Sequence, residues 1–357
     1  MTTLFAWMYK HERHLSAGAV LAGFIFDSIF FDRIDEPITH QVFISYLCIA
    51  AIAILWRHYL EEHTVEGVAR PRWHSLFPIM TQFAFGGLWS GFLIFYSQSA
   101  TLATSWPFLL LLAGIFLGNE LFKKYHERLV FNAVLYFFAL YSYTIFSVPL
   151  VTRAIGIGTF IISGIAAVAA FALFMLLLRR LGHFRFLKSA WQIRLWAGGV
   201  VVALNLFYFA NILPPLPLAL AEGGIYHMVE KQGAEYIAQA EAKPWYASLG
   251  FAPALHVAPG DSLFAYSAVF APIALTTTIA HEWQRYNSAA ASWVTQHTIS
   301  FSISGGRESG YRGYTITPNP PEGSWRVSIR TSDGRLIGRL NFSVVRGAHA
   351  TTETVQL

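Results

Sequence analysis

Charged residues and cysteine are scarce in this 357-residue sequence. Only 13% of its residues are charged and 55% are hydrophobic, whereas soluble globular domains have roughly 25% charged residues. Cys48 is the single cysteine, so no internal disulfide can stabilise an exported part of the chain. These two shortages exclude an ordinary soluble protein and a disulfide-rich one, and they indicate a membrane protein.

The motifs of common enzymes are also missing. The sequence contains no G-x-S-x-G, no P-loop and no H-E-x-x-H, and Gly156-x-Gly158 lacks the third glycine of a dinucleotide site. One run of side chains could offer metal ligands, although a solvated loop is the simpler interpretation: His58, Glu61, Glu62, His63, Glu66 and His74. We therefore expect no cofactor and no metal site, and we predict no catalytic residue.

Seven apolar segments are present, each long enough to cross a bilayer core, which takes ~17–25 residues. They are residues 15–31, 38–56, 76–96, 105–122, 129–148, 155–178 and 193–213. No A-x-A-like cleavage site follows the first, so we expect it to remain as a span. The sequence predicts a helical membrane domain over residues 1–220.

Lysine and arginine are distributed unevenly over the loops. The N-terminal segment and every second loop hold thirteen of them, whereas the alternate loops hold only Arg33 and Arg153. The positive-inside rule then predicts a cytoplasmic N-terminus, and an odd number of spans places the C-terminal domain in the periplasm. The net charge of +5 lies wholly in the first 220 residues, so it does not indicate nucleic-acid binding.

Polar residues within the spans are few. Asp27 and Glu120 are charged, and each lies close enough to a span end to reach interfacial water. Alternatively, Asp27, Asn119 and Glu120 could form the polar centre of a membrane-embedded enzyme. Three mid-span residues are expected to form interhelical hydrogen bonds: Gln82, Asn132 and Asn205.

Two small-residue motifs allow close helix packing. Gly87-x-x-x-Gly91 and Gly114-x-x-x-Gly118 lie in consecutive spans joined by a short loop. We expect an intramolecular hairpin, although a dimer seam stays open, and with it the oligomeric state.

Residues 221–254 are predicted to be an amphipathic linker. The prolines at 214, 215 and 217 end the last span, and Ile225, Met228, Val229 and Ile237 then recur at near-helical spacing. We expect an amphipathic helix at the outer membrane boundary, or else a spacer packed on the following domain.

From Leu255 the pattern alternates, which predicts an antiparallel β-sandwich over residues 255–346 and a tail over 347–357. Strands are expected over 263–270, 276–286 and 311–317. One face of a further strand should carry Trp293, Ile299, Phe301 and Ile303, and we expect Trp283, Trp293, Trp325 and Phe342 to form the core. The histidines His281 and His297 are expected to lie in the core or at its boundary.

A hairpin is predicted at Asp333-Gly334, with a two-residue turn. The resulting register places Trp325 opposite Phe342, and it continues as Val327–Leu340, Thr331–Leu336, Arg326–Asn341, Ser328–Arg339, Arg330–Ile337 and Ser332–Arg335. Four arginines then share the outward face: Arg326, Arg330, Arg335 and Arg339. They could bind an anionic protein, glycan or lipid, or form an ordinary solvated face.

Several segments resemble a known family. His281-Glu282-Trp283, the run from Gly310 to Thr315, the run from Gly323 to Val327 and the run from Asp333 to Arg339 are similar to a bacterial domain of unknown function, number 2914. Upstream segments resemble the multi-pass proteins that end in this domain: residues 23–27, 33–35, 106–108, 119–120 and 225–227. The resemblance implies a bacterial inner-membrane protein, and it supplies no catalytic residue.

The function that we favour is a membrane-anchored envelope module whose β domain binds a partner. A transporter or channel, and an enzyme acting on a lipid or lipid-linked substrate, are the alternatives. A proton or ion pathway would call for mid-span charge, and the sequence has none there.

Overall fold

The computed structural model describes residue 27 and residues 36–63, 76–99, 102–121, 128–215, 217–233, 235–242, 244, 252–272, 275–304, 310–347 and 351–357. The chain divides into two compact units. One comprises Met1–Ser97 and Ser105–Leu213, and the other comprises Gln98–Thr104 and Pro214–Leu357. We call them the helical unit and the β unit.

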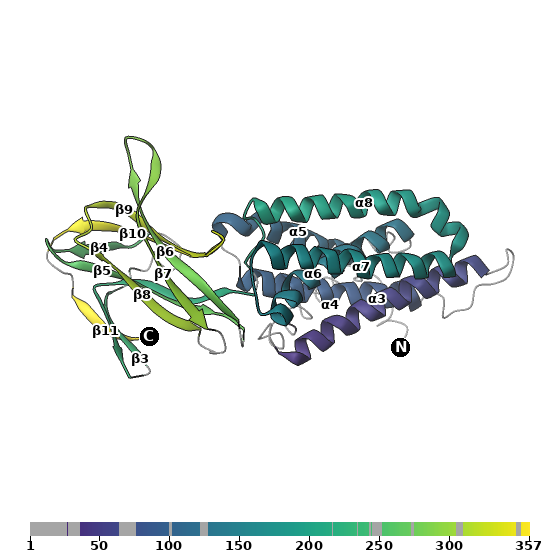
Figure 1. Cartoon of the computed structure of the whole chain (residues 1–357), viewed down its shortest axis with the longest axis horizontal. Helices are drawn as coiled ribbons and strands as arrows, with labels where there is room; N and C mark the ends of the chain where they lie inside the picture. Colours follow the sequence, from purple (N-terminus) through teal and green to yellow (C-terminus); the bar gives the residue numbers. More distant parts are fainter. Residues whose placement is uncertain are drawn as a thin grey trace, which may run out of the picture. The chain divides into compact units, whose positions relative to one another are not determined.

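Six helices form the described part of the helical unit (Figure 1). They are α3 (Pro37–His63), α4 (Leu76–Gln98), α5 (Leu102–Leu121), α6 (Leu129–Thr152), α7 (Ile157–Leu181) and α8 (His183–Phe209). Five are long and apolar enough to cross a membrane, and the apolar part of α5, Thr104–Asn119, is shorter. The predicted span over residues 15–31 lies outside the described residues except for Asp27, which is helical.

The last helix begins ten residues before the predicted span of 193–213. Gly182 separates α7 from α8, and a Glu62 carboxylate oxygen accepts a hydrogen bond from the backbone N–H of Phe184 (3.1 Å). This acceptor satisfies one of the N–H groups that the start of a helix leaves unpaired. The polar residues before 193 are therefore helical, although they lie outside the most apolar stretch.

Aromatic packing holds α3, α4 and α6 together. Phe43 stacks on Phe92 at a centroid distance of 5.1 Å and meets Phe146 edge to face at 5.3 Å. A Cβ at Gly87 or Gly91 would lie 2.4 Å from the ring of Tyr46 or Phe43, respectively. These glycines therefore pack within the chain, but against α3. Gly114 of α5 has nothing within 4 Å of a Cβ position, so it takes no part in close packing. Consecutive helices α4 and α5 nevertheless contact each other, as expected of a hairpin, through Tyr96 and Phe108.

Two of the mid-span polar residues form the interhelical hydrogen bonds that were predicted. The Gln82 amide donates to the Asn119 carbonyl (3.4 Å), joining α4 to α5. Asn205 of α8 donates to the Tyr141 hydroxyl of α6 (3.4 Å). Such bonds keep polar groups satisfied away from water.

The β unit consists of eleven described strands: β1 (Ala219–Tyr226), β2 (Met228–Gln232), β3 (Glu235–Glu241), β4 (Ala254–Val257), β5 (Ser262–Phe270), β6 (Thr276–Asn287), β7 (Ser292–Ser304), β8 (Tyr311–Pro318), β9 (Gly323–Thr331), β10 (Leu336–Arg346) and β11 (Thr352–Gln356). The sheet orders are β1-β5-β8, β4-β10-β9-β6-β7 and β11-β3-β2. The predicted strands over 263–270, 276–286 and 311–317 are confirmed as β5, β6 and β8. The expectation of a wholly antiparallel arrangement is wrong, because β4 pairs with β10 in parallel.

The amphipathic helix expected over residues 221–254 is wrong, because the segment contains β2, β3 and most of β1. Tyr236, Ala238 and Ala240 are buried at every second position of β3, and alternation with period two is the pattern of a strand. Gly233, at a φ of +66°, lies between β2 and β3. Residues 347–357, expected to be a tail, include β11, which pairs with β3.

A core cluster forms between side chains of the β1-β5-β8 sheet and the five-stranded sheet. Its largest members are Trp283, Trp325 and Phe342, with Leu263 of β5 packed among them. Trp325 is 2% exposed, and its Nε1–H donates to the Pro321 carbonyl (2.9 Å). The core is thus built without any cysteine, because Cys48 lies in α3.

The β9–β10 hairpin confirms the predicted register away from its tip. Four predicted pairs are present: Trp325 with Phe342, Val327 with Leu340, Arg326 with Asn341, and Ser328 with Arg339. Trp325 and Val327 are buried, whereas Arg326 lies on the opposite face. Alternation therefore separates a core face from an outward face.

The tip of the hairpin is a three-residue loop and not a two-residue turn. Thr331 N–H donates to the Arg335 carbonyl and Gly334 N–H donates to the Thr331 carbonyl, both at 2.9 Å. Gly334 takes the left-handed conformation (φ +83°) that such a loop requires at its last position. Ile337 is then an extra residue in β10, because the register shifts between Leu336 and Gly338. The predicted pairs Arg330–Ile337, Thr331–Leu336 and Ser332–Arg335 are therefore wrong.

Candidate functional site

Three arginines gather on the outward face of the five-stranded sheet. Arg326 and Arg330 come from β9 and Arg339 comes from β10. The adjacent strand β6 adds Glu282, which lies opposite Ser328. We call Arg326, Arg330, Arg339 and Glu282 the arginine face.

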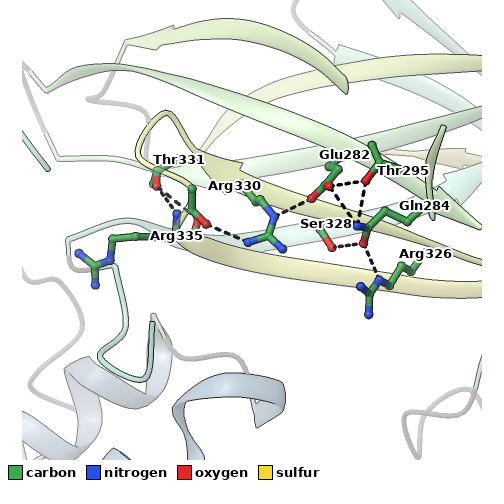
Figure 2. A network of polar contacts seen from close by, with 9 residues as sticks. Glu282, Gln284, Thr295, Arg326, Ser328, Arg330, Thr331 and Arg335 are labelled. Atoms are coloured by element: carbon green, nitrogen blue, oxygen red, sulfur yellow. Dashed lines mark hydrogen bonds and ion pairs between the residues drawn. The ribbon is translucent and has the colours of Figure 1, made fainter. Parts of the chain in front are cut away.

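Hydrogen bonds from β6 and β7 hold this face in place (Figure 2). Arg330 Nε donates to Glu282 Oε2 (2.7 Å), and Arg326 Nε donates to Gln284 Oε1 (2.6 Å). The Thr295 hydroxyl of β7 donates to Glu282 Oε1 (2.7 Å). Each arginine on β9 is thus held by an acceptor on the neighbouring strand.

Trp293 lies beside the arginine face and not in the core. The Arg326 guanidinium lies 4.4 Å from the centroid of the Trp293 ring, a cation–π distance. Trp283 pairs with His297 but Gln284 pairs with Thr295, so β7 contains one extra residue, Gln296. This bulge reverses the alternation toward Trp293, which explains why its expected place in the core is wrong.

The positive charges on this face repel one another. Burial, followed by repulsion from Arg339 and Arg330, lowers the pKa of Arg326. Burial, followed by repulsion from Arg330, likewise lowers the pKa of Arg339. Partial burial opposes ionisation of Glu282, but hydrogen bonds from Thr295 and Arg330 outweigh it and lower the pKa of this carboxyl. Glu282 therefore pairs directly with Arg330 and only partly offsets the charges of Arg326 and Arg339.

The Arg339 guanidinium is the least satisfied of the three. Its Nε is buried without a hydrogen-bond partner among the residues that the structure describes. An unpaired buried donor costs ~1–3 kcal/mol. An anion beside Arg339 would relieve this cost and the repulsion together.

Arg335 does not join the other three arginines. It is 9% exposed, and one of its terminal nitrogens donates to the Pro214 carbonyl (2.6 Å). The three-residue loop places Arg335 opposite Thr331, which is buried, whereas the predicted two-residue turn would have placed it opposite Ser332. Arg335 therefore stabilises the start of the β unit, and Figure 2 shows it turned away from Glu282.

The two polar candidates of the helical unit whose side chains are described, Asp27 and Asn119, do not meet at one point. Asp27 lies near the Ser90 side chain, whereas the Asn119 side chain donates to the Gln82 carbonyl (3.1 Å). Ser90 and Gln82 are eight residues apart on α4, which corresponds to ~12 Å of helix. The side chain of Glu120 lies outside the described residues.

His281 lies in the interior, as predicted. It is fully buried and hydrogen-bonds with Ser267 (2.8 Å) and Thr315 (2.9 Å). Burial lowers the pKa of His281 to about 4, so the ring is neutral at pH 7. His297 is half-buried and stacks on Trp283. A Ser–His pair without access to solvent is structural.

A second set of charged contacts escaped the sequence analysis. Glu241 of β3 accepts hydrogen bonds from His227 (2.8 Å) and from the backbone N–H of His256 in β4 (2.7 Å). It thereby joins strands of two sheets. The three residues are 14 and 15 positions apart, so no short motif reveals them. No group of side chains suited to a metal ion occurs among the described residues.

Comparisons with known proteins bear on the C-terminal part of the chain. Residues 276–344 match a family described as "Protein of unknown function (DUF2914)". The chain ends in a DUF2914 module. The module contains every residue of the arginine face, together with Trp293. No curated protein matches the chain.

Three solved structures show a distant similarity to the chain. An immunoglobulin-like protein from Pseudomonas aeruginosa is 11% identical, with a TM-score of 0.21, over 36% of this chain and 96% of that one. A β-glucosidase from Listeria innocua is 10% identical (TM-score 0.19; 34% and 17% covered). The DNA glycosylase AlkC from Pseudomonas fluorescens is 8% identical (TM-score 0.21; 86% and 98% covered). Scores this low carry no conclusion about the DUF2914 module.

Proposed function

We propose that this protein is a membrane-anchored envelope module whose DUF2914 module binds an anionic partner through the arginine face. The partner is an acidic segment of a periplasmic protein, an acidic glycan or an anionic lipid surface. The observation that carries the proposal is the crowding of Arg326, Arg330 and Arg339 around the single carboxylate of Glu282. Guanidinium groups suit carboxylates and phosphates, to which they can donate two hydrogen bonds at once.

The proposal includes a topology. Seven spans, with residues 15–31 as the first, place the N-terminus in the cytoplasm of a bacterial cell, the helices in the inner membrane and the β unit in the periplasm as a sandwich. The thirteen-to-two loop bias of Lys and Arg supports this orientation. Active alkaline phosphatase inserted in the exposed loop at Ser332 would support it, and activity only of a cytoplasmic reporter there would contradict it.

Rigidity supports a binding role for this face. The guanidinium groups of Arg326 and Arg330 are already held by Gln284 and Glu282, so an anion would order few side chains on binding. Arranging such groups in advance lowers the entropy cost of association. A solvated face would leave long side chains free.

Binding should be tested with the full chain in neutral detergent, using heparin as an acidic glycan and phosphatidylglycerol vesicles as an anionic surface. We expect Arg326→Ser/Arg339→Ser to weaken binding at least about tenfold, because a charge-assisted hydrogen bond contributes ~1.5–3 kcal/mol. Arg330 is left in place so that Glu282 keeps its partner.

The matched control is Lys231→Ser/Arg312→Ser, which changes the net charge equally but lies on β2 and β8. Equal losses in the two double variants would show that net charge alone drives binding. No loss in either variant would leave the arginine face as a solvated surface. Affinity should also fall as salt rises, because exposed charges are screened beyond about 8 Å at physiological ionic strength.

A further inference from the structure

The helices α7 and α8, together with α6, line an apolar cavity of about 450 Å³. Its volume falls within the ~300–1,000 Å³ of small-molecule sites. All of its lining residues are apolar except Arg179 and Arg194. On α7 the wall recurs at helical spacing, from Val168 through Phe171 to Arg179.

The two arginines have no partner within the described protein. Both side chains are exposed, and neither forms an ion pair or hydrogen bond with another described residue. Both α7 and α8 are apolar enough to cross a membrane. Arg179 lies in the last turn of α7, and both arginines lie at the ends of the predicted spans 155–178 and 193–213, at the level of the lipid head groups. Basic pockets between membrane helices bind anionic lipid head groups.

The length of the cavity wall matches one leaflet of a bilayer. Val168 and Arg179 are eleven residues apart, which corresponds to ~16 Å of helix. Half of a ~30 Å hydrocarbon core is about 15 Å. An acyl chain whose head group lies at Arg179 would therefore reach along the wall to Val168.

The wall formed by α8 has room for such a chain. Gly198 lines the cavity, and a Cβ placed on it would meet nothing within 4 Å. Gly199 is equally open but does not line the cavity. The chain thus offers a matched pair of positions, one inside the site and one outside it.

We propose that this cavity binds an anionic glycerophospholipid, with one acyl chain between α7 and α8 and its phosphate beside Arg179 and Arg194. In the proposed topology this lipid belongs to the cytoplasmic leaflet. The site is separate from the arginine face and does not depend on it.

Native mass spectrometry of the full chain in neutral detergent tests the head-group contact. Phosphatidylglycerol and phosphatidylcholine with identical acyl chains are the probes. We expect the wild-type protein to prefer phosphatidylglycerol by roughly fivefold to thirtyfold, the size expected for one or two basic residues at an anionic surface. Arg179→Gln/Arg194→Gln should abolish this preference, whereas Arg180→Gln/Lys188→Gln should keep it.

The acyl-chain contact has its own variant. Gly198→Leu should lower the binding of both lipids about tenfold or more by filling the cavity, whereas Gly199→Leu should bind them like wild type. Both changes favour the helix by ~0.5–1 kcal/mol, so Gly198→Leu stays informative even if the double arginine variant fails to fold.

Three results would overturn the proposal. They are equal binding of the two lipids by the wild-type protein, normal binding by Gly198→Leu, and competition by glycerol phosphate as effective as that by the lipid. The last result would mean that the arginines recognise a free phosphate and that the apolar wall takes no part.

Discussion

The two units of this chain differ in how many large apolar side chains they expose as well as bury. In the helical unit Leu110 and Ile165 are more than 60% exposed, whereas in the β unit Trp283 and Val327 are fully buried. The outer surface of the helices suits lipid and that of the sheets suits water. An exposed arginine is therefore ordinary on the sheets and unusual on the helices.

On a sheet surface one outward arginine is ordinary, and only the crowding of Arg326, Arg330 and Arg339 around Glu282 is unusual. On membrane helices a single unpaired arginine beside an apolar cavity is already unusual, as with Arg179 and Arg194. The comparison teaches that side chains indicate a binding site when they are unusual for their surroundings, which are water for the sheets and lipid for the helices.

Truncation should have the largest effect. Residues 214–357 expressed alone should unfold cooperatively in urea and be insensitive to reducing agent, because the single cysteine lies elsewhere. Residues 255–346 should show no cooperative transition. They lack β1, which pairs with β5, and they lack Tyr226 and Tyr236, which pack with Tyr266. Equal urea midpoints would mean that the two sheets of that segment suffice.

Replacing tryptophans should separate the core from the arginine face. Trp325→Ala should lower the free energy of unfolding by ~3–5 kcal/mol, the usual range for a buried aromatic residue. Trp293→Ala should cost about 1 kcal/mol, because it removes mainly a surface cation–π contact. Urea unfolding of residues 214–357, followed by circular dichroism, measures both. A larger loss for Trp293→Ala than for Trp325→Ala would indicate that Trp293 lies in the core.

Glycine substitutions sharpen the comparison within the membrane. Gly87→Ala should lower the thermal stability of the full chain in detergent, because its Cβ would overlap Tyr46, and overpacking costs ~1–3 kcal/mol. Gly114→Ala meets nothing within 4 Å and should be neutral or stabilising. A loss on Gly114→Ala and none on Gly87→Ala would instead favour the alternative that was left open, a dimer seam that includes α5.

The smallest expected effect is a pH dependence of the β unit. The folded pKa of His281 is about 4, below the ~6.5 of an unfolded histidine. The unfolded chain therefore binds the proton first, and the stability that depends on neutral His281 is lost as pH falls from about 6.5 toward 4. Between pH 7.5 and 5.5 this loss is roughly 1 kcal/mol. Burial also lowers the pKa of half-buried His297, so the control is His281→Gln. Its urea midpoint should fall less than that of the wild type when the pH is lowered from 7.5 to 5.5.

The elements that the sequence predicted share one property, namely a long and regular period. Six of the apolar spans are present as described helices, five of them long and apolar enough to cross a membrane, because ~20 apolar residues leave few alternatives. The outer pairs of the β9–β10 hairpin were also correct, as Trp325 opposite Phe342 shows. Glu282 could not be assigned to the arginine face, since the pairing of β6 with β9 depends on contacts distant in sequence.

Single extra residues account for the wrong places of Trp293 and Arg335. Gln296 in β7 moved Trp293 out of the core, and the third loop residue moved Arg335 away from the arginine face. A bulge changes the face of every residue beyond it without changing composition. The helix predicted within residues 221–254 was wrong for another reason. The spacings of three and four residues between apolar side chains in this short segment also fit two strands joined by a turn.

The hairpin that carries the arginine face contains two irregularities of one residue each, and they cancel. Deleting one loop residue alone, or Ile337 alone, would shift the register of β10 by one residue. Its core side chains would then face outward, and Arg339 would face the core. Losing both would leave every pair from Ile329 and Gly338 onward unchanged. Hairpins of this kind should therefore differ in length by two residues or not at all, because a change of one residue would turn outward side chains of one strand toward the core.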